Sequence, residues 1–307
     1  MTARQLIITV DTELSNFPDG QGLWGRTGNG EWGLPRLLDG LAEMDAPATF
    51  FLDVYGREPG DVAHQRRAAE LIVARRQDLQ LHTHPGPAFD PSRPRLRDYA
   101  LGEQQEILEF GRDRIEAWTG TRPTLHRAGD WGADGDSLTA LSRSGFEADF
   151  SASPWSSNCA IDDAVRSRNG WARVGPLLCG IGTCFHDRIT GRIRRVDVGG
   201  VSRAELLEVL GLGVDPFILT LHSFSLMNYD RSRTRFEAHP TYMDDLAYLC
   251  RVARDVHGYR VVSALEAVRS VTGGARLATH ALPSTSLAAS AMGLAKSIRA
   301  RFSWSAA

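Results

Sequence analysis

Lysine is almost absent from this chain: Lys296 is the only lysine among 35 basic residues, and the others are arginines. Residues 1–295 therefore cannot supply a Schiff-base lysine, the lysine of a phosphate-binding loop or a carbamylated lysine that bridges two metal ions. The basic residues are balanced by 37 acidic ones, and the net charge is −2. This balance gives no general attraction to nucleic acid, and we expect no nucleic-acid partner.

Cysteines and long apolar segments are also scarce. The four cysteines are scattered, and no second cysteine pair accompanies Cys179 and Cys184 to build a metal cluster with His186. No run reaches the roughly 18–20 apolar residues of a membrane span, and residues 1–10 lack the pattern of a secretory signal. We therefore expect free thiols, no transmembrane span and a cytoplasmic location, with a peripheral position at the inner face of the membrane as an alternative.

Short apolar runs alternate with helical patterns along most of the chain. The predicted strands are 5–10, 48–53, 78–82, 123–127, 147–151, 217–222 and 259–263. This alternation favours an α/β fold of parallel β/α units, closed or nearly closed into a barrel with its active site at the carboxyl ends of the strands. Residues 165–200 break the rhythm, and the segments 170–174 and 193–198 are predicted to form a small inserted hairpin.

The composition shifts to Ala and Ser after Gly273, which predicts a barrel domain over 1–272 and a tail over 273–307. We expect this tail to be disordered or loosely docked. The alternative is a surface helix that makes a weak contact with a membrane surface or a partner through 286–304. That alternative rests on an apolar stripe of five residues, Leu287, Ala291, Leu294, Ile298 and Phe302.

Two histidines one residue apart, His82 and His84, end one of the apolar runs. Side chains at i and i+2 of a strand point to the same face, so both imidazoles can converge on one divalent cation. Asp11 and Glu13 end another run with the same spacing. Alone, the carboxylates could cap a turn and the histidines could form a hydrogen-bonded loop pair. Together, the four residues favour a metal-dependent hydrolase.

In chain order, these pieces resemble the motifs of the NodB-homology polysaccharide deacetylases, a group of carbohydrate esterases, over about residues 5–270. Residues 9–13 resemble the first motif, 48–52 the second strand, 81–84 the histidine motif, 126–132 the arginine motif, 149–151 with Trp155 the fourth motif, and 219–222 the closing Leu-x-x-His. Two features differ from the family pattern. The usual adjacent aspartates are replaced by Asp11-x-Glu13, and the second histidine lies at i+2 instead of i+4, which indicates a divergent branch.

The resemblance implies a distorted seven-stranded β/α barrel that removes acetyl from an acetamido sugar of an envelope or surface-polysaccharide precursor. Glu13, His82 and His84 would hold one divalent ion, with zinc expected first and cobalt, nickel or manganese as alternatives. Asp11 would be the general base, although a ligand role stays open, and His222 would protonate the leaving amine.

Arg127 would keep Asp11 ionised and oriented. A structural ion pair of Arg127 with Asp130 or Asp134 is the alternative, and His222 could instead be a hydrogen-bonded core residue. Substrate contacts are predicted for five residues: Trp24, Trp32, His126, Asp130 and Trp131. The alternative for the two tryptophans is that they fill the mouth of the barrel. Two other functions remain open, hydrolysis of a non-sugar amide and binding of polysaccharide by an inactive barrel.

Overall fold

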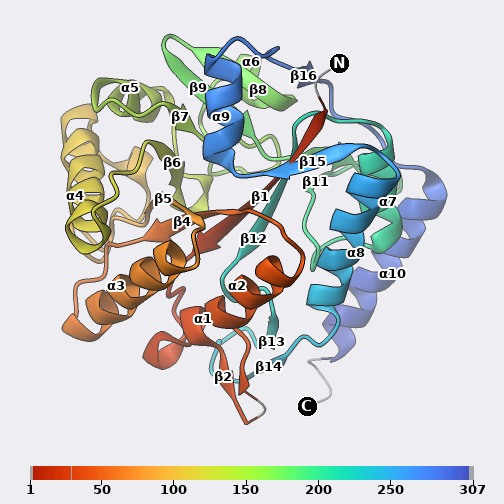
Figure 1. Cartoon of the computed structure of the whole chain (residues 1–307), viewed down its shortest axis with the longest axis horizontal. Helices are drawn as coiled ribbons and strands as arrows, with labels where there is room; N and C mark the ends of the chain where they lie inside the picture. Colours follow the sequence, from red (N-terminus) through yellow and green to blue (C-terminus); the bar gives the residue numbers. More distant parts are fainter. Residues whose placement is uncertain (1–2, 29, 304–307) are drawn as a thin grey trace.

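Within residues 3–28 and 30–303, which the computed structural model describes, ten strands form one curled sheet surrounded by helices (Figure 1). Its strands are β1 (Arg4–Thr12), β4 (Thr49–Asp53), β5 (Asp78–Thr83), β6 (Leu125–Ala128), β7 (Ala148–Asp149), β8 (Asn169–Val174), β9 (Leu177–Ile181), β12 (Phe217–His222), β15 (Tyr259–Val262) and β16 (Thr279–His280). Their order is β12-β1-β4-β5-β6-β7-β9-β8-β16, and β15 also pairs with β1. All seven predicted strands are present.

The strands from β12 to β9 run parallel, so their carboxyl ends share one rim. In this register Asp11 lies beside His222, Asp53 beside His82, and His82 beside Arg127. The rim therefore collects residues that are far apart in the sequence.

The sheet curls into a nearly closed barrel, as the alternation of strands and helices predicts. Thr183, just after β9, reaches the opposite edge of the sheet at β12. Its backbone N–H donates to the Ile218 carbonyl over 3.0 Å, and its Oγ1 accepts from the Ile218 N–H over 2.8 Å. A single residue thus links the edge strand β12 to the end of β9 and closes the curl of the sheet.

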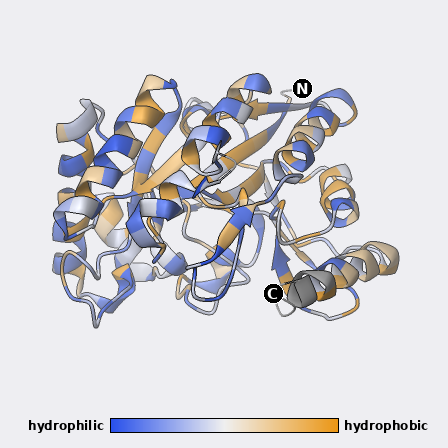
Figure 2. Cartoon of the chain, turned by 90° about the horizontal axis from the view of Figure 1, so that it is seen from below, coloured by the Kyte–Doolittle hydropathy of each residue, from blue (hydrophilic) through white to orange (hydrophobic). Residues whose placement is uncertain are grey.

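Helices pack around the sheet and bury one face each. The longer ones are α2 (Leu34–Glu43), α3 (Pro59–Ala74), α4 (Leu101–Thr119), α5 (Gly135–Arg143), α7 (Arg203–Gly211), α8 (Tyr242–Asp255), α9 (Ala264–Thr272) and α10 (Leu287–Ser303). The short ones are α1 (Gln21–Trp24), α6 (Asp163–Arg166) and the 3-10 turns η1 (Pro18–Gly20), η2 (Leu96–Asp98) and η3 (Gly129–Trp131). Figure 2 shows mainly hydrophobic central strands and helices with hydrophobic and hydrophilic stripes.

Alternation along the strands divides the core in two. Ile7, Phe51, Leu125 and Ile218 belong to one buried cluster, which α9 covers, whereas the neighbouring Leu6 belongs to the larger cluster beneath the other helices. Residues two apart share a face of the sheet. The inward face that contains Ile7, Phe51 and Leu125 therefore also carries the polar residues at the ends of the same strands.

The predicted pairing of 170–174 with 193–198 is wrong. Strand β8 pairs with β9 inside the main sheet, and β11 (Ile193–Arg195) pairs with β10 (Cys184–His186) in a separate hairpin. Two further hairpins lie in loops, β2 (Arg26–Thr27) with β3 (Gly30–Glu31) and β13 (Met227–Tyr229) with β14 (Phe236–Ala238). The apolar run of β9, the partner of β8, does not predict a strand clearly, because Gly180 interrupts it.

Residues 279–296 contact the rest of the chain, so of the expectation of a disordered or loosely docked tail, disorder does not hold for this stretch. Strand β16 pairs with β8, and the carboxylate of Glu208 on α7 accepts hydrogen bonds from the backbone and the hydroxyl of Ser286. The alternative, a surface helix, agrees with α10. Its apolar residues Leu287 and Ile298 are 61% and 46% exposed, whereas the side chain of Phe302 lies outside the described part.

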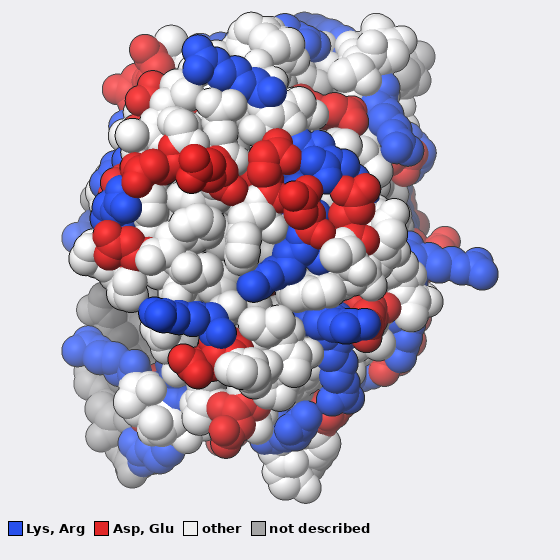
Figure 3. Space-filling view, turned by 90° about the vertical axis from the view of Figure 1, so that its left-hand side faces the viewer, with Lys and Arg blue, Asp and Glu red and all other residues white. Residues whose placement is uncertain are grey.

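The face of the molecule on the side of α3 and α4 carries acidic and basic side chains next to each other (Figure 3). Arg122, for example, pairs with Glu109, Asp113 and Glu116. This face therefore has no extended basic surface of the kind that nucleic acid requires. Among the described residues, none of the helices combines the length and the apolar character needed to cross a bilayer.

Candidate metal centre and active site

Glu13, His82 and His84 converge at the rim of the barrel. Glu13 Oε2 lies 2.6 Å from His84 Nε2 and 3.6 Å from His82 Nε2. One ligand atom from each residue lies within 4.8 Å of the others, and among the described residues this is the only such group of three. The convergence follows from the pleat, because His82 and His84 are two residues apart and Glu13 continues the inward face of β1.

Contacts around the two imidazoles fix their positions. His82 Nδ1 lies 2.9 Å from the carbonyl oxygen of Arg127. Since a carbonyl can only accept, Nδ1 carries the proton and Nε2 has a free lone pair. Beside His84, a Cβ at Gly129 would overlap with the imidazole ring. A glycine at this position therefore provides the space for the His84 ring.

This donor set fits a divalent metal ion. One carboxylate oxygen and two imidazole nitrogens suit zinc and neighbouring first-row ions, and the tautomer of His82 is the one that a metal needs. Burial opposes ionisation of Glu13, but both histidines bring its pKa well below the usual value. Burial also lowers the pKa of His84, but Glu13 more than compensates and raises it to about 10. Glu13 and His84 thus share a proton over the 2.6 Å between Oε2 and Nε2, and a bound cation would take the place of this proton.

Asp11 and Arg127 form a buried ion pair next to the donor set. Arg127 Nη1 donates to Asp11 Oδ1 over 2.6 Å, Nη2 donates to Thr9 Oγ1, and Nε donates to the Phe150 carbonyl. Both charged side chains are almost completely buried. Burial raises the pKa of Asp11, but Arg127 and the nearby histidines bring it below the usual value, so Asp11 is ionised. Arg127 pairs with Asp11 and not with Asp130 or Asp134.

His222 lies next to Asp11 at the end of β12. Its Nε2 is 4.0 Å from Asp11 Oδ2, and its ring packs against Phe224 with 4.9 Å between centroids. Burial lowers the pKa of His222, although Asp11 and Glu13 partly counteract this effect. His222 also lines the cleft described below, so the alternative of a hydrogen-bonded core residue does not fit its position.

A cleft of about 980 Å³ opens above the rim. Its lining includes Glu13 and His84 of the donor set together with His222. A volume of this order accommodates a sugar with a substituent. The candidate metal centre is thus open to a ligand on the side of the cleft.

Asp53, which sequence reasoning missed, also lines this cleft. It ends β4, lies beside His82 in the register, and accepts hydrogen bonds from the Tyr55 N–H and from Gln65 Nε2. Burial raises its pKa, while His84 opposes the shift. The alternation Thr49-x-Phe51-x-Asp53 is the signal that places this carboxylate on the inward face.

The two tryptophans of the first loop do not line the cleft. Trp24 is fully buried, donates from Nε1 to His64 Nδ1 over 2.9 Å and packs beneath the Arg67 guanidinium. Trp32 is partly buried and packs against the small cluster around Phe17. Stacking of Trp24 on a sugar is therefore excluded, and Trp32 instead supports a part of the wall.

His126 is fully buried and does not reach the cleft, which corrects its prediction as a substrate contact. Its Nδ1 lies 2.8 Å from Asp149 Oδ1, and its Nε2 lies 3.0 Å from Thr83 Oγ1. The reason is alternation: Arg127 points inward from β6, so the adjacent His126 points to the helical layer. Its environment is that of a hydrogen-bonded core histidine.

Asp130 and Trp131 lie at the edge of the site. Asp130 lines the cleft and its carboxylate is 3.9 Å from Arg95 Nε. Trp131 lies outside the lining and packs edge-on against Trp155, with the Arg195 guanidinium 4.7 Å above its ring. A direct substrate contact therefore stays a prediction for Asp130, whereas Trp131 contacts Arg195 and does not line the cleft.

The cysteines do not contribute to a site in the described structure. All four are free and buried, and burial raises the pKa of the Cys184 thiol to about 12. This agrees with the prediction of free thiols.

Comparisons with known proteins show a likeness in structure but not in sequence. No family model and no curated relative matches the chain. A protein assigned as a polysaccharide deacetylase from Mycobacterium smegmatis has a TM-score of 0.56 at 17% identity, with 89% of this chain and 92% of that chain covered.

Two weaker matches have similar descriptions. A mutant with restored enzymatic activity of a carbohydrate esterase family 4 pseudoenzyme from Bacillus anthracis has a TM-score of 0.48 at 18% identity, covering 87% of this chain and 68% of that one. A family 4 carbohydrate esterase from Bacillus subtilis has a TM-score of 0.46 at 12% identity, covering 88% and 82%. On the likeness to the mycobacterial protein, the chain has the fold of the polysaccharide deacetylases, as the resemblance of its motifs predicts.

Proposed function

We propose that this protein is a metal-dependent N-deacetylase that acts on an acetamido sugar of an envelope or surface-polysaccharide precursor. The observation that carries the proposal is the convergence of two units at one rim. One unit is the donor set Glu13, His82 and His84, and the other is the buried Asp11 carboxylate next to His222. Amide hydrolysis needs an activated water, a base and an acid, and the two units supply these functions.

A divalent ion held by Glu13, His82 and His84 would supply a Lewis acid and lower the pKa of water. Arg127 occupies Asp11 Oδ1, so Oδ2 can accept the proton of the attacking water. Because Arg127 keeps Asp11 ionised at neutral pH, the base is ready without prior deprotonation.

His222 is suited to protonate the departing amine. Burial lowers the pKa of its imidazole, so its protonated form is a stronger acid than a free imidazolium. Its Nε2 is 4.0 Å from Asp11 Oδ2, and the base and the acid therefore act on the same small volume at the rim.

The test is acetate release from a panel of N-acetyl sugars, free, nucleotide-linked and lipid-linked, with zinc, cobalt, nickel or manganese added. Acetate production that requires an added metal supports the proposal. Cleavage of small non-sugar amides with no cleavage of the sugars would favour the second hydrolase function. Purified protein without stoichiometric metal and without any activity would favour a binding-only barrel.

A further inference from the structure

One wall of the cleft carries three cationic side chains that come from separate segments. Arg195 ends β11, Arg233 lies between β13 and β14, and Lys296 lies on α10, and all three line the cleft. Among the described residues, neither Arg233 nor Lys296 forms an ion pair with a carboxylate. These two cations are therefore not directly paired with a carboxylate of the protein.

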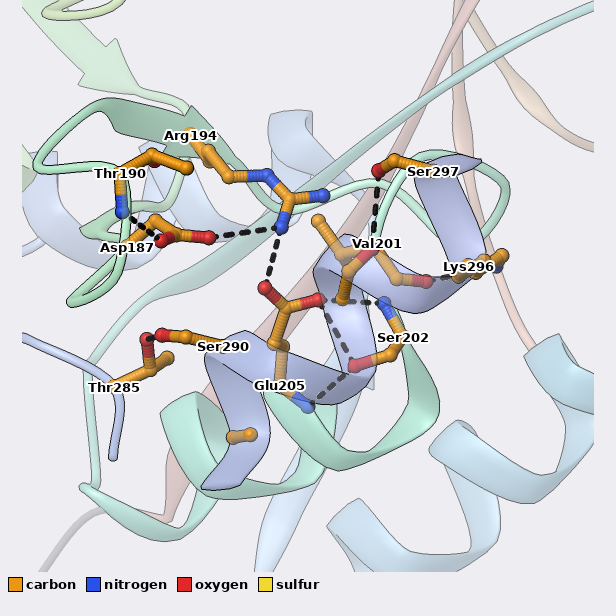
Figure 4. Close-up of polar contacts among 12 residues, drawn as sticks. Asp187, Thr190, Arg194, Val201, Ser202, Glu205, Thr285, Ser290, Lys296 and Ser297 are labelled. Carbon is orange, nitrogen blue, oxygen red and sulfur yellow. Dashed lines mark hydrogen bonds and ion pairs between the residues drawn. The ribbon is translucent and has the colours of Figure 1, made fainter. Parts of the chain in front are cut away.

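Lys296 is held so that part of its ammonium group remains available. Its Nζ donates to the carbonyls of Val198 and Val201, over 3.0 Å and 2.8 Å. Figure 4 shows Lys296 beside Val201, next to the network in which Glu205 accepts from Arg194 and Ser202. An ammonium group has three N–H donors, so one remains for a ligand. Lys296, the only lysine of the chain, thereby holds the loop that contains Val198 and Val201, and it adds a positive charge to this wall of the cleft.

Arg195 is also fixed but incompletely paired. Its Nη2 donates to Asp197 Oδ2 over 3.0 Å, and its guanidinium lies over the rings of Trp131 and Trp155 at 4.7 Å and 5.1 Å. Its Nη1 is buried and has no hydrogen-bond partner, and the same is true of Nδ1 of His239, another residue of the cleft lining. Buried polar atoms without partners are rare and unfavourable, which indicates that a ligand completes them.

One carboxylate, Asp197, lies on this wall, where the backbone N–H groups of Gly199 and Gly200 and the Arg195 side chain hold it. It balances one of the three cations. Arg233 and Lys296 thus have no directly paired carboxylate, although Asp245, Asp197 and Glu205 lie close enough to raise the pKa of Lys296 against the effect of burial. The other carboxylates of the lining, Glu13, Asp53, Asp61 and Asp130, come from other segments of the cleft. A neutral sugar would use only the polar and acidic part of the cleft.

We propose that Arg195, Arg233 and Lys296 form a subsite for a phosphate group, so that the substrate is an acetamido sugar linked to phosphate or diphosphate. Phosphate offers several acceptor oxygens and up to two charges to N–H donors from different directions. The reaction assigned to this substrate rests on the proposed function, whereas the binding of phosphate does not.

The binding test compares N-acetylglucosamine 1-phosphate with N-acetylglucosamine by calorimetry on the zinc-loaded full chain. We expect the phosphate to strengthen binding by about tenfold or more, and Lys296→Met or Arg195→Met to remove most of this gain. Lys296→Arg should keep part of it. Arg260→Met is the matched control, because Arg260 is exposed and pairs with Glu266 outside the cleft. Thermal unfolding and binding of the neutral sugar verify that each variant is folded.

Because phosphate can also bind a metal ion, His84→Ala provides a second comparison. Equal affinities of the two probes for the unmodified protein would overturn the proposal. The proposal would also be overturned if the gain in affinity from the phosphate disappeared in His84→Ala but persisted in Lys296→Met and Arg195→Met. Nucleoside-diphosphate-linked and prenyl-diphosphate-linked sugars then distinguish the two sources of the phosphate. If the phosphate strengthens binding but no acetate is released from any of these sugars, the result contradicts the proposed function and leaves the phosphate subsite in place.

Discussion

The imidazole of His82 donates from Nδ1 to the backbone carbonyl oxygen of Arg127 over 2.9 Å, while the side chain of Arg127 holds Asp11. One residue thus orients a candidate metal ligand with its backbone and the candidate base with its side chain. The two tasks are separable, because a substitution changes the side chain and leaves the carbonyl in place.

Replacement of Arg127 by methionine should therefore reduce turnover without removing the metal. Asp11 would remain as a buried carboxylate without its partner, which costs about 3–5 kcal/mol of stability. Metal binding is measured by metal analysis, turnover by acetate release, and the free energy of unfolding by urea denaturation. The double variant with Asp11→Asn should regain part of the stability, since no unpaired charge remains. Loss of metal from a folded Arg127→Met protein would contradict the assignment.

Asp11→Asn and His222→Ala should each lower the rate of acetate release by about 10²–10⁴-fold, the usual contribution of a general base or acid. Both proteins should bind metal, because neither residue belongs to the donor set. The measurement is the rate at saturating substrate together with the metal content. A variant with normal turnover would remove that residue from the mechanism.

Glu13→Gln and His84→Ala should lose metal affinity, and a chelator should abolish activity that added zinc restores. The physical reason is that each of the three ligands contributes one donor atom to the same position. Metal bound only to the folded state raises the unfolding temperature, by an amount that grows with the metal concentration. Asp53→Asn serves as a comparison, because Asp53 lies nearby but outside the group of three. An unfolding temperature that zinc raises equally in His84→Ala and the unmodified protein would argue against this centre.

The buried His126 should make stability depend on pH. Burial lowers its pKa in the folded protein, despite Asp149 beside it, whereas in the unfolded chain its pKa is about 6.5. Below about pH 6.5 the unfolded state takes up a proton that the folded state resists, so the free energy of unfolding decreases as the pH falls. Urea denaturation of the unmodified protein and of His126→Gln between about pH 7.5 and 5.5 tests this. The free energies of unfolding of the two proteins should become more similar as the pH falls. A difference that stays constant with pH would show that His126 does not contribute to the pH dependence of stability.

The strands and the rim residues could be predicted because they depend on local alternation. The pairs Asp11 and Glu13, and His82 and His84, each follow the period of two that places them on one face. The same rule, applied to β6, would have separated His126 from Arg127, and applied to β4 it would have identified Asp53. A motif taken as a unit does not reveal the face of the sheet to which each of its residues points.

Other features depend on contacts that are distant in the sequence. Trp24 is buried because His64 and Arg67 of α3 pack against it, and nothing within its own loop indicates this. Strand β8 pairs with β9 and β16, so the sheet extends into a region where glycines hide the apolar pattern. The position of Lys296 in the cleft likewise requires the packing of α10 on α7, which Ala-rich and Ser-rich composition does not reveal.

Gly293 provides a direct test of that packing. A Cβ at this position would overlap with the carboxylate oxygens of Glu205, which is fully buried and held by Arg194 and Ser202, so it cannot yield easily. Gly293→Ala should therefore destabilise the protein by about 1–3 kcal/mol, although Ala is normally the better helix former. Gly102→Ala on α4 is the matched control, because a Cβ there meets nothing within 4 Å, and it should stabilise the protein by about 0.5–1 kcal/mol. Chemical denaturation compares the two. If both variants were stabilised to the same extent, α10 would not be packed against Glu205 in solution, and the contribution of Lys296 to the cleft would be lost with it.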